Sequence, residues 1–298
     1  MSALGSALFD SPPRDVRVLE RLGGHSGAEV VLCEHGSDNF VRKTAAGSGT
    51  NPRLRKQAIK QRLYAAQGFP LPAVRSIGKD DSGRAFFDMD YVPSRTLAEL
   101  VISGQSYDRS GVVEAVAQIL WIFRSCVAGT LSADIFTNKI ADVAQSTGSN
   151  PAAASHRDTI AALARQLAGH DWSNIPASPG HGDLTLENIL VSPGQGVMFI
   201  DCDEPFASSY WLDFAKLFQD FDGHWCLRDG AKDRAAAGNE LTVLGREFRA
   251  LAKEANPKLP PRLAQLAALH LFRTLGYARS AETVDFICGA SARILAVA

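Results

Sequence analysis

The 298-residue chain has no hydrophobic run long enough for a membrane, no close cysteine pair and no excess of either charge. No apolar stretch approaches the ~18 residues of a membrane-spanning helix, so we expect no membrane partner. The five cysteines are scattered and form no Cys-x-x-Cys pair, which favours a reducing cytoplasm over a disulfide framework or a zinc site. The formal net charge of -1 disfavours a general nucleic-acid binder, because such domains are usually basic. The opening residues lack a basic segment, so we expect no signal peptide.

What is present is the composition of an ordinary soluble globular protein. Hydrophobic residues make up 46% of the chain and charged residues 21%, which excludes the hydrophilic, highly charged composition of disordered chains. A chain of 298 residues is long enough for a sizeable core and favours two lobes over one. The composition therefore indicates a broad class of protein and leaves its function open.

The first third of the chain has the alternating pattern of an antiparallel sheet. Three short segments that contain β-branched residues, at residues 16–19, 29–33 and 39–43, are separated by turn-forming residues and are predicted as strands. A helical pattern follows at residues 52–64, with Asn51 as the expected N-cap, Pro52 in the first turn and Gly68 beyond its end. Two further strands are expected at residues 73–77 and 85–90.

The rest of the chain has a mostly helical pattern. We expect helices near residues 96–103, 110–126, 134–145 and 156–168, and again near 211–220, 241–254, 262–277 and 281–297. Loop and short strands interrupt them at residues 180–203. Strands and one helix followed by a helical body indicate an α+β fold with two lobes. The best boundary lies at residues 91–93, so we expect an N-terminal lobe at residues 1–92 and a larger C-terminal lobe at residues 93–298.

The most informative stretch is the polar loop that contains His181 and Asp183. Asn188 lies five residues after Asp183, and a later short strand ends at Asp201. If the strand returns the chain to the loop, two carboxylates and one amide oxygen meet at one loop mouth. Such hard oxygen ligands suit Mg²⁺, which takes its remaining ligands from water and phosphates. The same spacing of Asp, Asn and a later metal-binding Asp occurs in the catalytic loop of kinases.

These motifs resemble those of aminoglycoside phosphotransferases and choline kinases, a group of small-molecule kinases with a protein-kinase-like fold. The group has His-Gly-Asp where protein kinases have His-Arg-Asp, an Ile-Asp metal strand and an Asp-Leu-Ala helix start. The corresponding residues here are His181-Gly182-Asp183, Ile200-Asp201 and Asp213-Phe214-Ala215. The resemblance covers most of residues 15–220 in order. It implies a bilobal protein-kinase-like fold and an ATP- and Mg²⁺-dependent phosphotransferase.

The resemblance assigns roles to residues on both sides of the expected boundary. Asp183 becomes the catalytic residue that accepts the proton of the substrate hydroxyl, and Asn188 and Asp201 become the Mg²⁺ ligands. Lys43 is expected to contact the α- and β-phosphates of ATP, with a solvated strand-end lysine as the alternative. The remaining nucleotide contacts are expected from the turn at Gly24, Ser26 and Gly27 and from the backbone of Asp90 and Val92.

Three further residues are expected to support these groups. His181 is expected to fix the loop by hydrogen bonds, and Asp213 to brace it as an N-terminal cap of the following helix. Asp203 has two interpretations of equal weight, a contact with a second metal or an anchor for its own loop.

One departure from the family concerns the first helix. The family has a glutamate there that pairs with the strand lysine, whereas the matching position here is Gln57, with Gln61 as the alternative. Glutamine can accept a hydrogen bond from Lys43 but brings no charge, so we expect the lysine to be held less firmly. The helix is also basic, which indicates a solvated face or an attraction for an anion. Its basic residues are Arg53, Arg55, Lys56, Lys60 and Arg62.

Charge is the main constraint on the acceptor. Residues 226–298 contain eleven Lys or Arg and seven Asp or Glu, which disfavours a polycationic aminoglycoside. We therefore expect a neutral or anionic hydroxyl compound, such as a sugar, nucleoside or metabolite. An aromatic cage for choline is disfavoured, because core packing better explains Tyr210, Trp211 and Trp225. One helix face either lines the acceptor site or faces solvent, and it carries His270, Arg273 and Tyr277.

Two other functions compete with this prediction. A catalytically silent nucleotide-binding or scaffold protein of the same fold fits Gln57, but the intact Asp183, Asn188 and Asp201 count against it. A protein kinase is disfavoured by the His-Gly-Asp loop and by the lack of an Ala-Pro-Glu segment after Asp201. The sequence therefore predicts a cytoplasmic, ATP- and magnesium-dependent transferase that acts on a small molecule.

Overall fold

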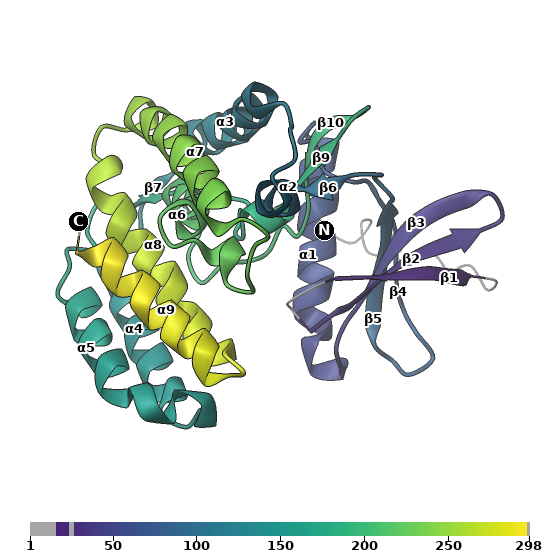
Figure 1. Cartoon of the computed structure of the whole chain (residues 1–298). Coiled ribbons are helices and arrows are strands. Elements are labelled where there is room, and N and C mark those ends of the chain that lie inside the picture. The colour runs from purple at the N-terminus through teal and green to yellow at the C-terminus, as the bar shows by residue number, and fades with distance from the viewer. Residues whose placement is uncertain (1–15, 24–26, 297–298) are drawn as a thin grey trace. The chain divides into compact units, whose positions relative to one another are not determined.

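The computed structural model describes residues 16–23 and 27–296 (Figure 1). The chain divides into two compact units. The first unit comprises residues 1–94 and 192–204, and the second comprises residues 95–191 and 205–298. The first unit therefore combines the N-terminal part of the chain with a short segment from much later in the sequence. That segment contains strand β10 (Gly196–Phe199) and Asp201, one of the predicted metal ligands.

The first unit is built on a five-stranded antiparallel sheet with the strand order β1-β2-β3-β5-β4. Its strands are β1 (Arg17–Leu22), β2 (Glu29–His35), β3 (Asp38–Thr44), β4 (Val74–Lys79) and β5 (Ala85–Asp90). In the register of β3 with β5, Val41 lies opposite Met89 and Lys43 lies opposite Phe87. Because side chains alternate along a strand, Val41 and Lys43 share one face of the sheet.

Helix α1 (Asn51–Ala66) packs beside this sheet (Figure 1). Ala58 of the helix is buried in one core with Val41, Phe87 and Met89 of the strands. Burial of each large apolar side chain contributes about 1.5–3 kcal/mol relative to exposure. Met89 is a buried member of this core at the end of β5. The Gln61 amide of α1 lies 3.4 Å from the Met89 sulfur.

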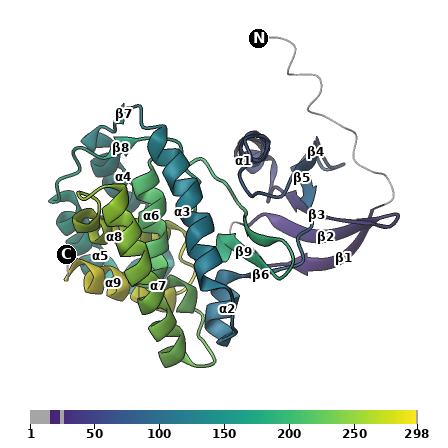
Figure 2. The ribbon, with the colours of Figure 1, turned by 90° about the horizontal axis from the view of Figure 1, so that it is seen from above.

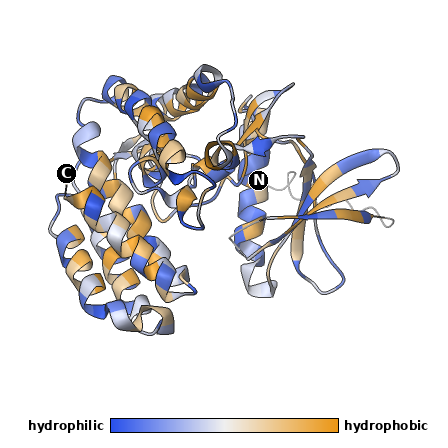
Figure 3. Cartoon of the chain, viewed as in Figure 1, coloured by the Kyte–Doolittle hydropathy of each residue, from blue (hydrophilic) through white to orange (hydrophobic). Residues whose placement is uncertain are grey.

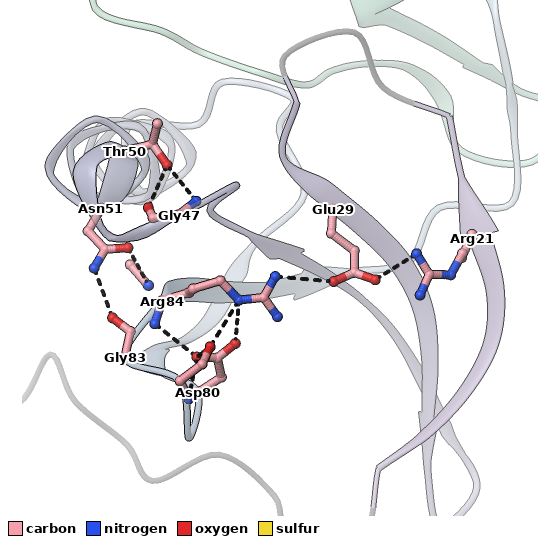
Figure 4. Close-up of polar contacts among 10 residues, drawn as sticks. Arg21, Glu29, Gly47, Thr50, Asn51, Asp80, Gly83 and Arg84 are labelled. Carbon is pink, nitrogen blue, oxygen red and sulfur yellow. Dashed lines mark hydrogen bonds and ion pairs between the residues drawn. The ribbon is translucent and has the colours of Figure 1, made fainter.

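Asn51 does not cap α1 as predicted, because its side chain is engaged at a neighbouring turn. The N-cap is Thr50, and Asn51 is the first residue of the helix. The Asn51 amide donates to the Gly83 carbonyl at 2.9 Å, and its oxygen accepts from the Ala85 amide at 2.6 Å (Figure 4). These bonds satisfy backbone groups at the turn between β4 and β5, and they tie the start of α1 to the sheet.

The second unit is mostly helical. Its helices are α2 (Leu97–Ser103), α3 (Arg109–Ser125), α4 (Ala133–Thr147), α5 (Arg157–Ala168), α6 (Tyr210–Phe221), α7 (Arg234–Ala255), α8 (Pro260–Thr274) and α9 (Ala281–Leu295). Two pairs of short antiparallel strands accompany them, β6 (Arg95–Thr96) with β9 (Ile189–Ser192) and β7 (Gly129–Thr130) with β8 (Pro176–Ala177). Helix α6 packs against α3, α7 and α8 (Figure 2).

Helix α7 begins at Arg234, well before the predicted start near residue 241. The Asp233 carboxylate caps it by accepting hydrogen bonds from the amides of Ala235 and Ala236 at 3.1 and 3.0 Å. The alanine-rich first turns carry no apolar periodicity, which explains why the pattern located only the later part of the helix.

The helices of the second unit carry bands of apolar and hydrophilic residues (Figure 3). None of the helices in the described part of the chain combines the length and the apolarity needed to cross a membrane.

Candidate active site

Helix α6 is buried along its whole length and yet carries charged residues. Asp213, Lys216 and Asp220 follow the i, i+3, i+7 spacing, so they share one face of the helix. A buried charge is stable only when it is paired or hydrogen-bonded. Each of the three has a partner within residues 181–188, which form the predicted catalytic loop.

Asp213 fixes the start of this loop. Its carboxylate accepts hydrogen bonds from the backbone amides of His181 at 2.7 Å and Gly182 at 2.8 Å. Two glycines permit the arrangement. Gly182 has a φ of +93°, which favours glycine, and a Cβ on Gly180 would lie 2.7 Å from the Asp213 carboxylate. Asp213 thus braces the loop as expected, but the N-cap of α6 is Ser209.

Asp183 is held from several directions within the second unit. One carboxylate oxygen lies 2.9 Å from Lys216 Nζ, and the other accepts from the Asn188 amide at 3.1 Å. The Asn188 amide also donates to the Asp183 carbonyl at 2.7 Å, and the Asp183 backbone amide donates to His181 Nδ1 at 3.3 Å. Burial acts to raise the pKa of Asp183, but it is outweighed by the Lys216 ammonium together with smaller contributions from His181 and Asn188. The pKa therefore lies below its ordinary value.

Asp220 fixes the far end of the loop. Its carboxylate accepts hydrogen bonds from the backbone amides of Leu186 and Cys226, both at 2.9 Å. Burial raises the pKa of Asp220 to about 7, although the Leu186 amide acts in the opposite direction. Glu187, which follows Leu186 in the loop, forms an ion pair of 2.7 Å with the buried side chain of Arg228.

Replacing Asp220 with asparagine is expected to remove part of the pH dependence of stability. The unfolded carboxyl loses its proton near pH 4 and the folded one near pH 7, so raising the pH across this window destabilises the native state. Between pH 5 and pH 8 the wild-type free energy of unfolding should fall by about 2–3 kcal/mol more than that of Asp220→Asn. Urea unfolding at both pH values measures this difference. Asp158→Asn, an exposed change on α5, should keep the wild-type dependence, and equal dependence in Asp220→Asn would contradict the prediction.

The first unit contributes a second charged pair. Lys43 at the end of β3 is buried, and its Nζ lies 2.7 Å from Asp201 Oδ1. Asp201 has a φ of +61°, a left-handed conformation that aspartate tolerates better than most residues. Lys43 is therefore not a solvated strand-end lysine, which was the alternative interpretation. The pair places one predicted phosphate contact next to one predicted metal ligand.

The basic face of α1 is paired with the segment that follows Asp201. Arg53 forms an ion pair with Asp203, and Lys56 pairs with Glu204 at 2.8 Å. Lys60 Nζ donates to the Asp203 carbonyl. Of the two interpretations of Asp203, these contacts support the anchor for its own loop. They also give Arg53, Lys56 and Lys60 specific partners within the first unit.

The family's glutamate is absent from α1, and the negative charge beside Lys43 comes from a residue outside this helix. Gln57 is buried on α1, and Gln61, the alternative, donates to the Pro72 carbonyl at 2.8 Å. Helix α1 contains no acidic residue, and the carboxylate beside Lys43 is that of Asp201. The charge opposite the lysine therefore comes from the predicted metal strand.

The predicted nucleotide contacts that fall within the described residues belong to the first unit. Gly27 has a φ of +75°, whereas Gly24 and Ser26 lie outside the described residues. The Asp90 amide donates to the Ala73 carbonyl at 3.0 Å, and the Val92 carbonyl accepts from the Ser94 hydroxyl at 2.9 Å.

The predicted metal ligands lie in different units, Asn188 in the second and Asp201 in the first. Within the described ranges, no three His, Cys, Asp or Glu side chains gather as a metal site by themselves.

The aromatic and α8 residues considered for the acceptor are mostly structural. Tyr210 and Trp211 are buried in α6, as core residues should be. His270 is buried too, and its Nε2 lies 3.1 Å from the Leu212 carbonyl of α6. Tyr277 lies beyond the end of α8 and is 79% exposed, so the three residues of the predicted helix face do not share one environment.

Two residues of this site were missed by sequence reasoning, Lys216 and Asp220. The available signal was their spacing from Asp213, because charged residues at i, i+3 and i+7 are unusual on a helix whose other residues are mostly apolar.

Comparison with known proteins identifies the family. A model of the phosphotransferase enzyme family matches residues 18–253. That match covers most of the chain, so the chain belongs to the phosphotransferase enzyme family. No curated protein matches its sequence.

Solved structures of small-molecule kinases share the fold. A thermostable aminoglycoside phosphotransferase mutant, in ternary complex with ADP and hygromycin B, has 17% identity and a TM-score of 0.57 over 95% of this chain and 93% of that one. Choline kinase LicA from Streptococcus pneumoniae has 17% identity and a TM-score of 0.57 over 95% of each chain. A glucosamine kinase has 15% identity and a TM-score of 0.55 over 94% of this chain and 75% of that one. The predicted α+β, bilobal protein-kinase-like class is confirmed.

Proposed function

We propose that the chain is an ATP- and Mg²⁺-dependent phosphotransferase that phosphorylates a hydroxyl group of a small molecule. The observation that carries the proposal is the hold on Asp183. Lys216 and Asn188 each engage one of its carboxylate oxygens, and the side chain keeps 40% of its surface exposed. A carboxylate that is fixed and still accessible suits the acceptance of a proton from a substrate.

The proposed reaction is a direct transfer. The acceptor oxygen attacks the γ-phosphorus of ATP, and a new P–O bond forms as the bond from that phosphorus to the β,γ-bridging oxygen breaks. ADP leaves with the electron pair of the broken bond, and the hydroxyl proton passes to a carboxylate oxygen of Asp183. Positioning and charge neutralisation supply most of the rate in such a transfer.

The donor set of Asn188 and Asp201 fits Mg²⁺. Asp201 offers a carboxylate, and because the Asn188 amide nitrogen donates to Asp183, the Asn188 oxygen is the atom that suits a cation. Bound Mg²⁺ would neutralise charge on the phosphate oxygens of ATP. Lys43, beside Asp201, would add a compact cation for the α- and β-phosphates.

The adenine base would be held by backbone groups. The Asp90 amide already donates to the Ala73 carbonyl, so the Asp90 carbonyl is the group that would accept from the amino group of adenine. The Val92 carbonyl already accepts from the Ser94 hydroxyl, so the Val92 amide is the group that would donate to a ring nitrogen of adenine. The turn that contains Gly27 would lie over the phosphates.

The proposed acceptor is neutral or anionic. The excess of Lys and Arg over Asp and Glu in residues 226–298 disfavours a polycation. The structural neighbours include a choline kinase, a glucosamine kinase and an aminoglycoside phosphotransferase, so the fold alone does not choose among such hydroxyl compounds.

An acceptor screen tests this function. ADP release from MgATP would be measured with sugars, nucleosides, amino alcohols and aminoglycosides, with Asp183→Asn as the matched control. We expect at least one neutral or anionic hydroxyl compound to raise the wild-type rate above that of the variant. If MgATP binds but no acceptor does so, the chain is a silent nucleotide-binding protein of this fold.

A further inference from the structure

Lys216 is a charged residue that α6 does not need for packing. Every residue of this helix is buried, and an apolar side chain at position 216 would bury without the cost of a charge. Its acidic neighbours on the same helix are engaged elsewhere, since Asp213 holds the amides of residues 181 and 182 and Asp220 holds those of residues 186 and 226. Lys216 forms an ion pair with Asp183.

The two partners of this pair differ in exposure. The side chain of Lys216 is 11% exposed, whereas that of Asp183 is 40% exposed. The ammonium therefore reaches the carboxylate from the interior of the second unit, and the carboxylate keeps an accessible side. Asn188 engages the second carboxylate oxygen at 3.1 Å, so rotation of the carboxylate is restricted at both oxygens.

We propose that Lys216 is a positioning residue for phosphoryl transfer, which fixes the orientation of the Asp183 carboxylate toward the acceptor hydroxyl. This inference rests on the proposed function. Lys216 acts through Asp183, so its contribution should vanish when Asp183 can no longer accept a proton. A general base contributes fully only when its accepting oxygen lies in line with the proton that it removes.

A double-mutant cycle tests this dependence. MgATP-dependent transfer to water, and to any acceptor found in the screen, would be measured in wild type, Lys216→Met, Asp183→Asn and the double variant. With water, the P–O bond forms to the water oxygen, ADP leaves, and the proton passes to Asp183. We expect Lys216→Met to lower kcat by about 100-fold, with KM and Kd for MgATP within about threefold of wild type. In the Asp183→Asn background the same change should cost less than about threefold.

Two further variants separate positioning from a structural role. Lys216→Arg, which keeps the charge, should recover at least about tenfold of the loss in kcat. Lys253→Met, an exposed change on α7, should leave kcat unchanged. Thermal melting shows whether each variant is folded, and Lys216→Gln replaces Lys216→Met if the latter does not fold.

The outcomes distinguish a failure of this inference from a failure of the proposed function. A Lys216→Met rate within about threefold of wild type overturns the inference alone. So does an equal loss in both backgrounds, because a structural role would act independently of Asp183. A wild-type chain without MgATP-dependent transfer, to water or to any acceptor, overturns the proposed function and this inference with it.

Discussion

Asp183→Asn is expected to lower phosphoryl transfer by about 10³-fold while it leaves the Kd for MgATP within about threefold of wild type. Asparagine keeps the size of the side chain and an oxygen for the Lys216 ammonium, which lies 2.9 Å from the wild-type carboxylate. It loses the negative charge and the capacity to take up the hydroxyl proton. Initial rates of ADP release and calorimetric titration with MgATP measure the two quantities separately.

The matched control for this change is Asp142→Asn. Asp142 is exposed on α4, and the same loss of one carboxylate there should leave both rate and affinity unchanged. An Asp183→Asn variant that keeps more than about a tenth of the wild-type rate would show that proton acceptance by Asp183 is not required.

Lys43→Met is expected to weaken MgATP binding by about tenfold and to lower transfer by about 100-fold. Methionine preserves the buried aliphatic volume beside Phe87 but removes the cation 2.7 Å from Asp201. The variant therefore loses a phosphate contact and leaves the Asp201 carboxylate without its ammonium partner. Titration with MgATP and initial rates report the two effects.

A second strand-end lysine provides the comparison. Lys79 ends β4 and is exposed, so Lys79→Met removes a lysine from the same unit without disturbing an ion pair with Asp201. We expect wild-type affinity in this variant. Equal affinities for Lys43→Met and Lys79→Met would show that the buried lysine has no role in nucleotide binding.

Local sequence signals located most elements of the fold. The period-two pattern of residues 39–43 predicted β3, which runs from Asp38 to Thr44. It also placed Lys43 near the end of that strand. The spacing from Asp183 to Asn188 predicted a loop in which the two side chains are now seen in contact. These features depend on neighbours close in the sequence, which is why a single sequence reveals them.

The features that were missed depend on partners distant in sequence. Asn51 has the residue type of an N-cap, but the backbone of Gly83 and Ala85 takes its side chain. From the sequence alone, Lys216 and Asp220 have the residue types of surface charges. The helix that carries them is buried in the structure. The spacing from Asp213 indicates that these charges share one helix face, but their partners in residues 181–188 are set by tertiary packing.

Helix α6 unites the observations on the catalytic loop. Asp213 holds its start, Lys216 holds the carboxylate of Asp183, and Asp220 holds the Leu186 amide. One rigid, buried element thus fixes three points of a loop that has little regular structure of its own. Functional groups held in this way lose little entropy when a substrate is positioned.

Calorimetric titration of the chain with ATP, with and without Mg²⁺, tests the proposed nucleotide site. We expect saturable binding that requires Mg²⁺, that weakens in Lys43→Met and that persists in Asp183→Asn. A wild-type chain that does not bind MgATP would show that the chain is not an ATP-dependent phosphotransferase.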